Sequence, residues 1–368
     1  MLVSHFQAFS NVLQNGKQEQ KTVPLGTVFR SLAADIVTDL AMPESYNLLD
    51  TKDLGFAHAD FVLGITKLAT WNRFIPYLIP LLDKIPRWLV KLQGETALHV
   101  VDGVLGQMMQ ARRLVENKGK PISNKEFPVI MNEVYNCEVL PPKEKTVKRL
   151  FDEVGIIIGA GSETTGMSLS ATIWHVLANP EIHERLRKEI RDEFTEEELN
   201  TILSYKRLEG LPYLNACVME GLRLANAVSG RLPRINRTQA MAYHGTIDGS
   251  KEVTYAIPPN TPVSMSIRDV HYNPTVFPSP TTFDPERWLD PVRKQVSEKF
   301  FVAFGRGTRS CIGRNLAMAE MLMGVANLIG RFQCELGEGM GRDEIELVHD
   351  CFSAYVGRGK GSMRIRVR

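Results

Sequence analysis

One stretch decides the fold of this chain: Phe304-Gly305-Arg306-Gly307-Thr308-Arg309-Ser310-Cys311-Ile312-Gly313. Its glycines permit backbone conformations and close approaches that a Cβ atom would forbid. The residues from Arg314 onward read as a helix, so Cys311 lies where unpaired N–H groups and the helix dipole favour a thiolate. A thiolate on a glycine-rich loop can be approached closely by a flat ligand and suits a haem iron. Taken alone, a cysteine such as Cys311 is more often a buried structural residue.

The spacing of this stretch, Phe304-x-x-Gly307-x-Arg309-x-Cys311-x-Gly313, resembles the haem-thiolate signature of the cytochrome P450 family position for position. The resemblance implies haem b as the cofactor and Cys311 as the axial ligand of its iron. Arg309 would then reach a haem propionate, because a fixed bidentate cation suits a carboxylate. Phe304 would pack beside the sulfur and exclude water, and Gly305 and Gly313 would complete the haem-binding loop.

Other basic residues have expected roles around the same cofactor. Arg231 and Arg234 are both candidates for the other side of the macrocycle, and the sequence does not choose between them. Arg306, Arg314 and Lys299 offer a basic face near the thiolate, where an acidic electron-donor protein could dock. An ordinary solvated surface is the alternative for this face.

A long helix is predicted from about Lys145 to Ala178, ended by Asn179-Pro180. Between Val154 and Pro180 its only charge is Glu163, which raises the possibility of a membrane-spanning helix. Its several glycines, serines and threonines, together with a histidine, are too polar for lipid, so we favour a buried central helix.

Midway along this helix lies Ala160-Gly161-Ser162-Glu163-Thr164-Thr165. Glycines weaken a helix interior and hydroxyls compete for its carbonyls, which indicates a local widening. The motif resembles the oxygen-activation segment of the family, with Thr164 as the hydroxyl beside O₂ and Glu163 as the acid behind it. The resemblance implies that these two residues are catalytic and deliver protons.

Glu220 and Arg223 share one face of a predicted helix, an arrangement that is common on protein surfaces. In the family they resemble a buried pair that is joined by the arginine of Pro285-Glu286-Arg287-Trp288. Buried charges require such complete pairing. We therefore expect Glu220, Arg223 and Arg287 to form a structural ion network behind the haem loop.

The totals indicate one globular domain, residues 1–368. The chain of 368 residues is 43% hydrophobic and 23% charged, and no linker, repeat or low-complexity tract divides it. Its net charge of +2 does not indicate nucleic acid as a partner. The 5 cysteines lie scattered without CxxC spacing, which argues against a disulfide framework and against structural zinc and suits a reducing compartment. The resemblance implies the mainly helical P450 fold with a small β-sheet part.

The amino-terminal part of the family is not recognised in this sequence. The first residues contain neither a signal peptide nor an anchor, and no tryptophan begins a Trp-x-x-x-Arg pattern. We therefore expect a P450 domain that is incomplete at its N-terminus and lacks the first strands and helices. Full-length relatives would lie at the cytosolic face of the endoplasmic reticulum membrane, and the missing anchor leaves the cytoplasm as an alternative for this chain.

Aromatic and aliphatic residues from Trp71 to Val90 are interrupted by prolines and charges. This composition indicates either a segment that dips into a membrane interface or two short packed helices. Other predicted elements are helices at 28–41, 180–193, 211–225 and 314–332, strands at 253–257 and 262–267, and a strand-rich tail.

Together the motifs predict a haem-thiolate monooxygenase that inserts one atom of O₂ into an apolar organic substrate. The resemblance implies electrons from NADPH through NADPH-cytochrome P450 reductase, and a place in fungal secondary metabolism or in aromatic or terpenoid hydroxylation. One alternative is a haem-thiolate isomerase or dehydratase, which needs no O₂. The other is a truncated, non-catalytic remnant.

Overall fold

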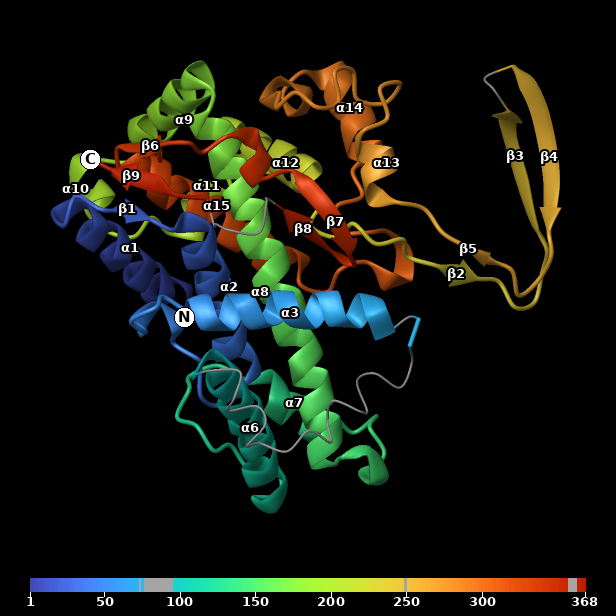
Figure 1. Cartoon of the computed structure of the whole chain (residues 1–368), viewed down its shortest axis with the longest axis horizontal. Helices are drawn as coiled ribbons and strands as arrows, with labels where there is room; N and C mark the ends of the chain where they lie inside the picture. The colour runs from blue at the N-terminus through green and yellow to red at the C-terminus, as the bar shows by residue number, and fades with distance from the viewer. Residues whose placement is uncertain (73, 76–94, 248–249, 357–362) are drawn as a thin grey trace.

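The computed structural model describes residues 1–72, 74–75, 95–247, 250–356 and 363–368. Helices form most of the described chain and small antiparallel sheets accompany them, which confirms the predicted fold class (Figure 1). The α-helices are α1 (Leu2–Gln18), α2 (Leu25–Ala41), α3 (Phe56–Asn72), α6 (Glu95–Glu116), α7 (Ile130–Asn136), α8 (Val147–Leu177), α9 (Pro180–Glu193), α10 (Glu196–Leu199), α11 (Tyr205–Leu208), α12 (Pro212–Ala225), α13 (Ile267–His271), α14 (Pro291–Phe300) and α15 (Arg314–Arg331). The strands are β1 (Thr22–Val23), β2 (Arg234–Ile235), β3 (Met241–Ile247), β4 (Lys251–Ile257), β5 (Pro262–Val263), β6 (Cys334–Leu336), β7 (Leu347–Cys351), β8 (Ser353–Val356) and β9 (Ile365–Val367).

α8 is the central element, and it runs through the middle of the view in Figure 1. Thr146 caps its first turn, because the threonine hydroxyl accepts a hydrogen bond from the Arg149 amide at 3.2 Å. Hydroxyl groups along its second half donate to carbonyls one turn back, as Ser170 does to Gly166 at 2.8 Å. These bonds satisfy the polar groups of a buried helix, and the favoured interpretation of a buried central helix is correct. No helix among the described residues has the length and apolar character needed to cross a membrane.

The predicted widening of α8 is wrong. The helix is continuous from Val147 to Leu177, and two of its glycines instead allow close contact with α2. A Cβ atom at Gly166 would lie 2.7 Å from the Arg30 Cα atom, and one at Gly161 would lie 2.8 Å from a Val37 methyl group. Small residues at these positions therefore fix where the two helices cross.

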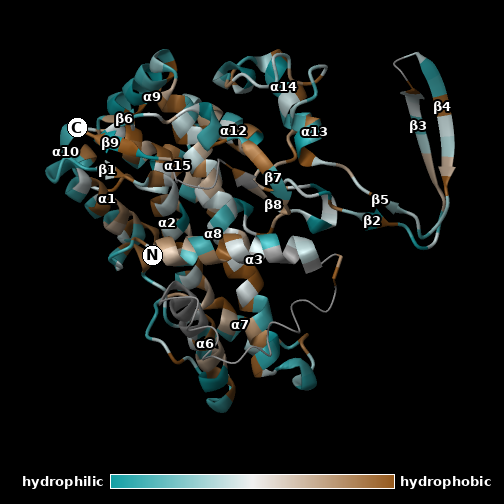
Figure 2. Ribbon diagram, in the orientation of Figure 1, coloured by the Kyte–Doolittle hydropathy of each residue, from teal (hydrophilic) through white to brown (hydrophobic). Residues whose placement is uncertain are grey.

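Two apolar clusters hold the helices together. The larger one joins α1, α2, α9, α12 and α15 around the second half of α8, with Phe9, Phe29 and Leu169 fully buried. The smaller one joins α2, α6 and α7 to the first half of α8 through residues such as Leu114 and Leu150. α9 is largely hydrophilic in Figure 2 and buries only a narrow apolar stripe, as an amphipathic surface helix should.

In the part of the chain that the structure describes, the sheets are small, with two or three strands each. β9 pairs with β1 on one side and with β6 on the other, so the last strand ties the first to the end of α15. β3 and β4 form a hairpin that projects away from the body in Figure 1. Tyr243 and Tyr255 lie opposite each other on this hairpin, with their ring centroids 6.4 Å apart.

The other predicted elements agree with the structure apart from one strand. The helices at 28–41, 180–193, 211–225 and 314–332 correspond to α2, α9, α12 and α15. The predicted strand 262–267 is only partly present, because β5 ends at Val263 and the Ser266 hydroxyl caps α13 by accepting from the Asp269 amide. Most of the segment from Trp71 to Val90 lies outside the described residues.

Candidate active site

The loop before α15 carries Cys311 on an open surface. Gly305 and Gly307 have φ values of +66° and +75°, a region that residues with side chains rarely adopt. The Cys311 amide donates to the Phe304 carbonyl at 2.8 Å and closes the loop. Cys311 is exposed, and the side chain of Ile312 beside it is completely exposed. A fixed backbone thus presents a thiol next to an uncovered apolar side chain.

Phe304 lies half-buried beneath this loop, between two neighbours. Its ring meets the edge of Phe301 at a centroid distance of 6.3 Å, and the Arg314 guanidinium lies 5.7 Å from its centroid. The ring is therefore held in place from both sides, which is what a residue that shields the sulfur requires.

The residues around Cys311 fit a haem. A cysteine thiolate can serve as an axial ligand of haem iron, and the exposed side chain of Ile312 offers apolar contact to the flat haem ring. No atom lies within 4 Å of the place that a Cβ atom at Gly307 would take, so the loop is open on that side. Arg309 and Arg231 are exposed, and neither has a hydrogen-bond or ion-pair partner in the part of the chain that the structure describes. Such unpaired guanidinium groups suit the two propionates of a haem.

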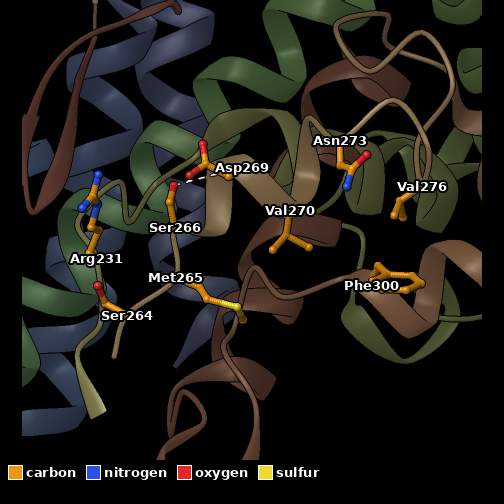
Figure 3. A pocket seen from close by; sticks show the side chains of 9 residues that line it. All are labelled: Arg231, Ser264, Met265, Ser266, Asp269, Val270, Asn273, Val276 and Phe300. Carbon is orange, nitrogen blue, oxygen red and sulfur yellow. Dashed lines mark hydrogen bonds between the residues drawn. The ribbon is translucent and has the colours of Figure 1, made fainter. Parts of the chain in front are cut away.

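Arg231 and Arg234 remain alternatives for the second propionate. Arg231 lines the cavity in Figure 3, which has a volume of about 370 Å³. Arg234, on β2, donates from Nη1 to the Pro233 carbonyl at 3.0 Å. In that cavity the Ser266 hydroxyl accepts from the Asp269 amide at 3.3 Å (Figure 3). Cys311 is not among the residues that line it.

Thr164 lies on a face of α8 that the rest of the described chain covers only in part. Ile156, Ala160 and Thr164 follow one another at four-residue steps and therefore share one face of the helix. Ile156 is 70% exposed, Ala160 is exposed and Thr164 is half-buried. The Thr164 hydroxyl donates to the Ala160 carbonyl at 2.7 Å. An apolar stripe with one hydroxyl is a surface that an apolar ring could cover.

Glu163 points to a different neighbour. Its buried carboxylate accepts both bonds from Nε of Arg30, on α2, at 2.9 and 3.0 Å. Glu163 and Thr164 are adjacent in sequence, but their side chains bond to different partners, since successive residues lie about 100° apart around a helix. The sequence analysis missed Arg30, which lies 133 residues before its partner and belongs to no local motif.

Thr164 lies on α8 and the Cys311 loop leads into α15, and these two helices cross each other. α8 and α15 cross where Leu169 meets Gly324, since a Cβ atom at that glycine would lie 2.7 Å from the leucine side chain. At 1.5 Å per residue, Thr164 lies about 8 Å from the crossing along α8, and Arg314 about 15 Å from it along α15. The two candidate elements are thus held by the same contact in the apolar core.

Behind the loop, the structure brings Glu220, Arg223 and Arg287 together. Arg223 binds Glu220 through Nε at 2.9 Å and Nη2 at 2.8 Å, and Nε of Arg287 lies 3.1 Å from the same carboxylate. All three are buried, and the Trp288 indole donates to Glu220 at 3.0 Å. Trp288 is a further member that the sequence analysis missed, although it directly follows Arg287.

The remaining bonds of both arginines go to backbone carbonyls. Arg223 donates through Nη1 to the carbonyls of His271 and Pro280, at 2.8 and 2.7 Å. Arg287 donates through Nη2 to those of Pro278 and Ser279, at 2.5 and 3.0 Å. The network therefore holds the irregular segment after α13 against α12.

Comparisons with known proteins agree on one family. The sequence model of the family described as cytochrome P450 matches residues 2–349. The N-acetyltryptophan 6-hydroxylase ivoC of Emericella nidulans is 31% identical over 353 residues, which are 95% of this chain and 66% of the relative. The cytochrome P450 monooxygenase sdnE of Sordaria araneosa is 34% identical over 348 residues, which are 90% of this chain and 64% of the relative. The chain thus spans slightly less than two thirds of these relatives.

The fold is also similar to that of a solved structure. A crystal structure of a cytochrome P450 superposes with a TM-score of 0.73 and covers 100% of this chain and 76% of its own. The sequence identity between the two is 17%, so this likeness describes the fold.

Proposed function

The chain belongs to the cytochrome P450 family, and from this premise we propose that it is a haem-thiolate monooxygenase acting on an apolar organic substrate. One observation carries the proposal: one glycine-rich loop presents the exposed Cys311 thiol together with the exposed Arg309 and the completely exposed side chain of Ile312. When bound, a haem would supply the oxidising chemistry, and its thiolate ligand would increase the electron density at the iron. The name of the Emericella relative, a tryptophan-derivative hydroxylase, supports an aromatic substrate in secondary metabolism.

Each site residue has a proposed task toward this cofactor. Cys311 would be the axial ligand, and Phe304 would keep water from its sulfur. Arg309, with Arg231 or Arg234, would neutralise the propionates. Thr164 would hold a hydroxyl proton on the α8 face, while Glu163 would exchange protons with it only after leaving Arg30. The network of Glu220, Arg223 and Arg287 would have a structural role.

The electron supply, location and domain organisation are further parts of the proposal. We propose NADPH and a cytochrome P450 reductase as the donor, docked on the basic face of Arg306, Arg314 and Lys299. The residues 1–368 would form one domain, at the cytosolic face of the endoplasmic reticulum membrane or in the cytoplasm. Contact with the membrane would involve Trp71 to Val90.

A second candidate, a haem-thiolate isomerase or dehydratase, is favoured by the ion pair between Glu163 and Arg30. Arg30 binds the Glu163 carboxylate, which an oxygen-activating site would use as its acid, whereas an isomerase needs no such acid. A purified protein that consumes NADPH and O₂ with added reductase supports the monooxygenase. Conversion of an oxygenated substrate without NADPH would support the isomerase instead.

The ligand assignment has a direct test. In the haem-loaded protein, Cys311→Ala should abolish the red-shifted absorption band of the ferrous–CO complex and leave the far-UV circular dichroism unchanged. Cys137 is also an exposed free cysteine, so Cys137→Ala is the matched control and should keep the band. If Cys311→Ala keeps the band, Cys311 is not the ligand and the proposed function is wrong.

A further inference from the structure

His271, the last residue of α13, lies buried between the ion network and the start of the Cys311 loop. Its Nδ1 lies 3.1 Å from the Arg223 carbonyl, and its Nε2 lies 3.0 Å from the Val302 amide nitrogen. A carbonyl can only accept and a backbone amide can only donate. The ring must therefore carry its proton on Nδ1 and accept the Val302 N–H at Nε2.

Both sides of the ring are fixed by other contacts. The His271 carbonyl accepts from Nη1 of Arg223 at 2.8 Å, so these two residues bind each other reciprocally. Phe301 stacks on the imidazole with centroids 5.6 Å apart and an interplanar angle of 17°, and Phe277 meets it edge-on at 6.0 Å. The ring is fully buried among these groups.

From Val302 the bonds continue to the thiol-bearing residue. The Val302 carbonyl accepts from the Gly305 amide at 2.8 Å, and the Phe304 carbonyl accepts from the Cys311 amide at 2.8 Å. Gly305 directly follows Phe304, so the two bonds lie on adjacent residues of one turn. A parallel path of rings runs from His271 through Phe301 to Phe304.

We propose that His271 is a positioning residue for the Cys311 thiolate: it fixes the start of the thiolate loop to the Glu220–Arg223 network through its bonds to Arg223 and Val302. This inference rests on the proposed function, in which Cys311 is a haem ligand. Neither His271 nor Val302 belongs to the motifs that identify the family in this sequence.

The charge state of the ring agrees with this role. Burial, with a smaller contribution from the nearby Arg223 guanidinium, lowers the pKa of His271 to about 3. The imidazole therefore stays neutral at ordinary pH and keeps the lone pair that Val302 needs. A protonated ring would direct an N–H at the N–H of Val302.

The test is amide hydrogen exchange on residues 1–368, followed at single-residue resolution at Val302. His271→Leu removes both the donor and the acceptor, and exchange at Val302 should accelerate about tenfold or more. The side chain of His271→Gln is similar in length and ends in an acceptor and a donor, so the exchange rate at Val302 should stay close to that of the wild type. The matched control is His175→Leu, since His175 is also buried but stacks on Phe283, and Val302 should be unaffected.

Unchanged exchange at Val302 in His271→Leu would overturn the inference, as would equal acceleration in the His175 control. Should His271→Leu fail to fold, His271→Asn replaces it, because its shorter side chain can reach Arg223 but not Val302. Rapid exchange at Val302 is then expected, and slow exchange overturns the inference.

A second readout addresses the thiolate itself. In the haem-loaded protein, the red-shifted ferrous–CO band of His271→Leu should decay several-fold faster in mild denaturant than that of the wild type, with recovery in His271→Gln. Equal decay in all three proteins contradicts a positioning role. If the wild type never develops the band, the proposed function is wrong, while the exchange result at Val302 still decides whether His271 fixes the loop.

Discussion

Thr164 and Glu163 are neighbours on α8, but their side chains face different surroundings. The Thr164 hydroxyl lies on the uncovered stripe of α8, while the Glu163 carboxylate faces Arg30 and α2. Only the hydroxyl is thus positioned on the open face without a change of rotamer.

We therefore predict that Thr164→Ala keeps its haem but forms less product for each NADPH consumed. Loss of one proton-transfer group reduces a rate by about a hundredfold or more, so hydrogen peroxide should accumulate in place of product. Thr164→Ser keeps the hydroxyl and is the control. The measurement is the ratio of product to NADPH with added reductase, and an unchanged ratio in Thr164→Ala would contradict the role of this hydroxyl.

Two buried histidines make the stability of the protein depend on pH. Burial lowers the pKa of His175 to about 3, with Arg342 and Arg223 adding to the effect, and burial likewise lowers the pKa of His271 to about 3. In the unfolded chain both take up a proton near the ordinary pKa of about 6.5. Their stabilising contribution is therefore complete above pH 6.5 and is lost as the pH falls toward 3, by about 1.4 kcal/mol per pH unit for each residue.

His175→Leu isolates one of these contributions. At pH 7 the variant should be less stable than the wild type, because it loses the stacking on Phe283 at 5.0 Å. The difference in unfolding free energy should shrink between pH 6 and 4, since the variant lacks the group that protonates in the unfolded state. Urea unfolding at several pH values measures this, and parallel curves would show that His175 titrates alike in both states.

At the scale of elements, the contact between α2 and α8 depends on glycine. A Cβ atom at Gly166 would meet the Arg30 backbone at 2.7 Å, and backbone cannot move aside as a flexible side chain can. Gly159, on the same helix, has no atom within 4 Å of its own Cβ position. The same substitution should therefore have opposite effects at the two positions.

We predict that Gly166→Ala destabilises the protein by about 1–3 kcal/mol through overpacking, and that Gly159→Ala stabilises it by up to about 1 kcal/mol through helix propensity. Thermal unfolding followed by circular dichroism at the helix band is the measurement. Equal stability of the two variants would mean that α2 can shift along α8 at little cost.

These same glycines mark the limit of what the sequence could predict. The long helix, its buried character and the paired residues Glu220 and Arg223 follow from local spacing, and the structure has them. The role of Gly161 and Gly166 cannot be predicted from local spacing, because helix propensity alone indicates only a weakened helix. Their role becomes clear from the position of α2, which packs closely against both glycines. Arg30 was missed for the same reason: its partner is distant in sequence.

The irregular regions were also difficult to predict. The apolar residues after Pro262 indicate a strand, but β5 ends at Val263 because a serine cap starts α13 three residues later. His271 belongs to no local pattern either, since its two ring partners lie in α12 and in the cysteine loop. Polar contacts between distant segments are decided by tertiary packing, which periodicity does not record.

For the whole molecule, Glu220 joins α12 to the segment that precedes the cysteine loop. Its carboxylate accepts bonds from Arg223, Arg287, Trp288 and the Asp284 amide, and all of these residues but Asp284 are buried. The two arginines in turn bind carbonyls of the proline-rich segment that precedes the cysteine loop. One carboxylate is thus the shared counter-charge of two buried guanidinium groups, whose other donors go to backbone carbonyls.

We predict that Glu220→Gln destabilises the protein by about 3–5 kcal/mol, because the amide keeps the shape but leaves two buried cations without a counter-charge. Glu286 is the matched control: it also pairs with an arginine, Arg185, but both side chains are about half exposed. Glu286→Gln should cost no more than about 1 kcal/mol, as exposed ion pairs do. Urea unfolding of the two variants gives the comparison. A cost for Glu220→Gln as small as that of the control would mean that the proline-rich segment is held by packing rather than by charge, and the position of the cysteine loop would then not depend on this network.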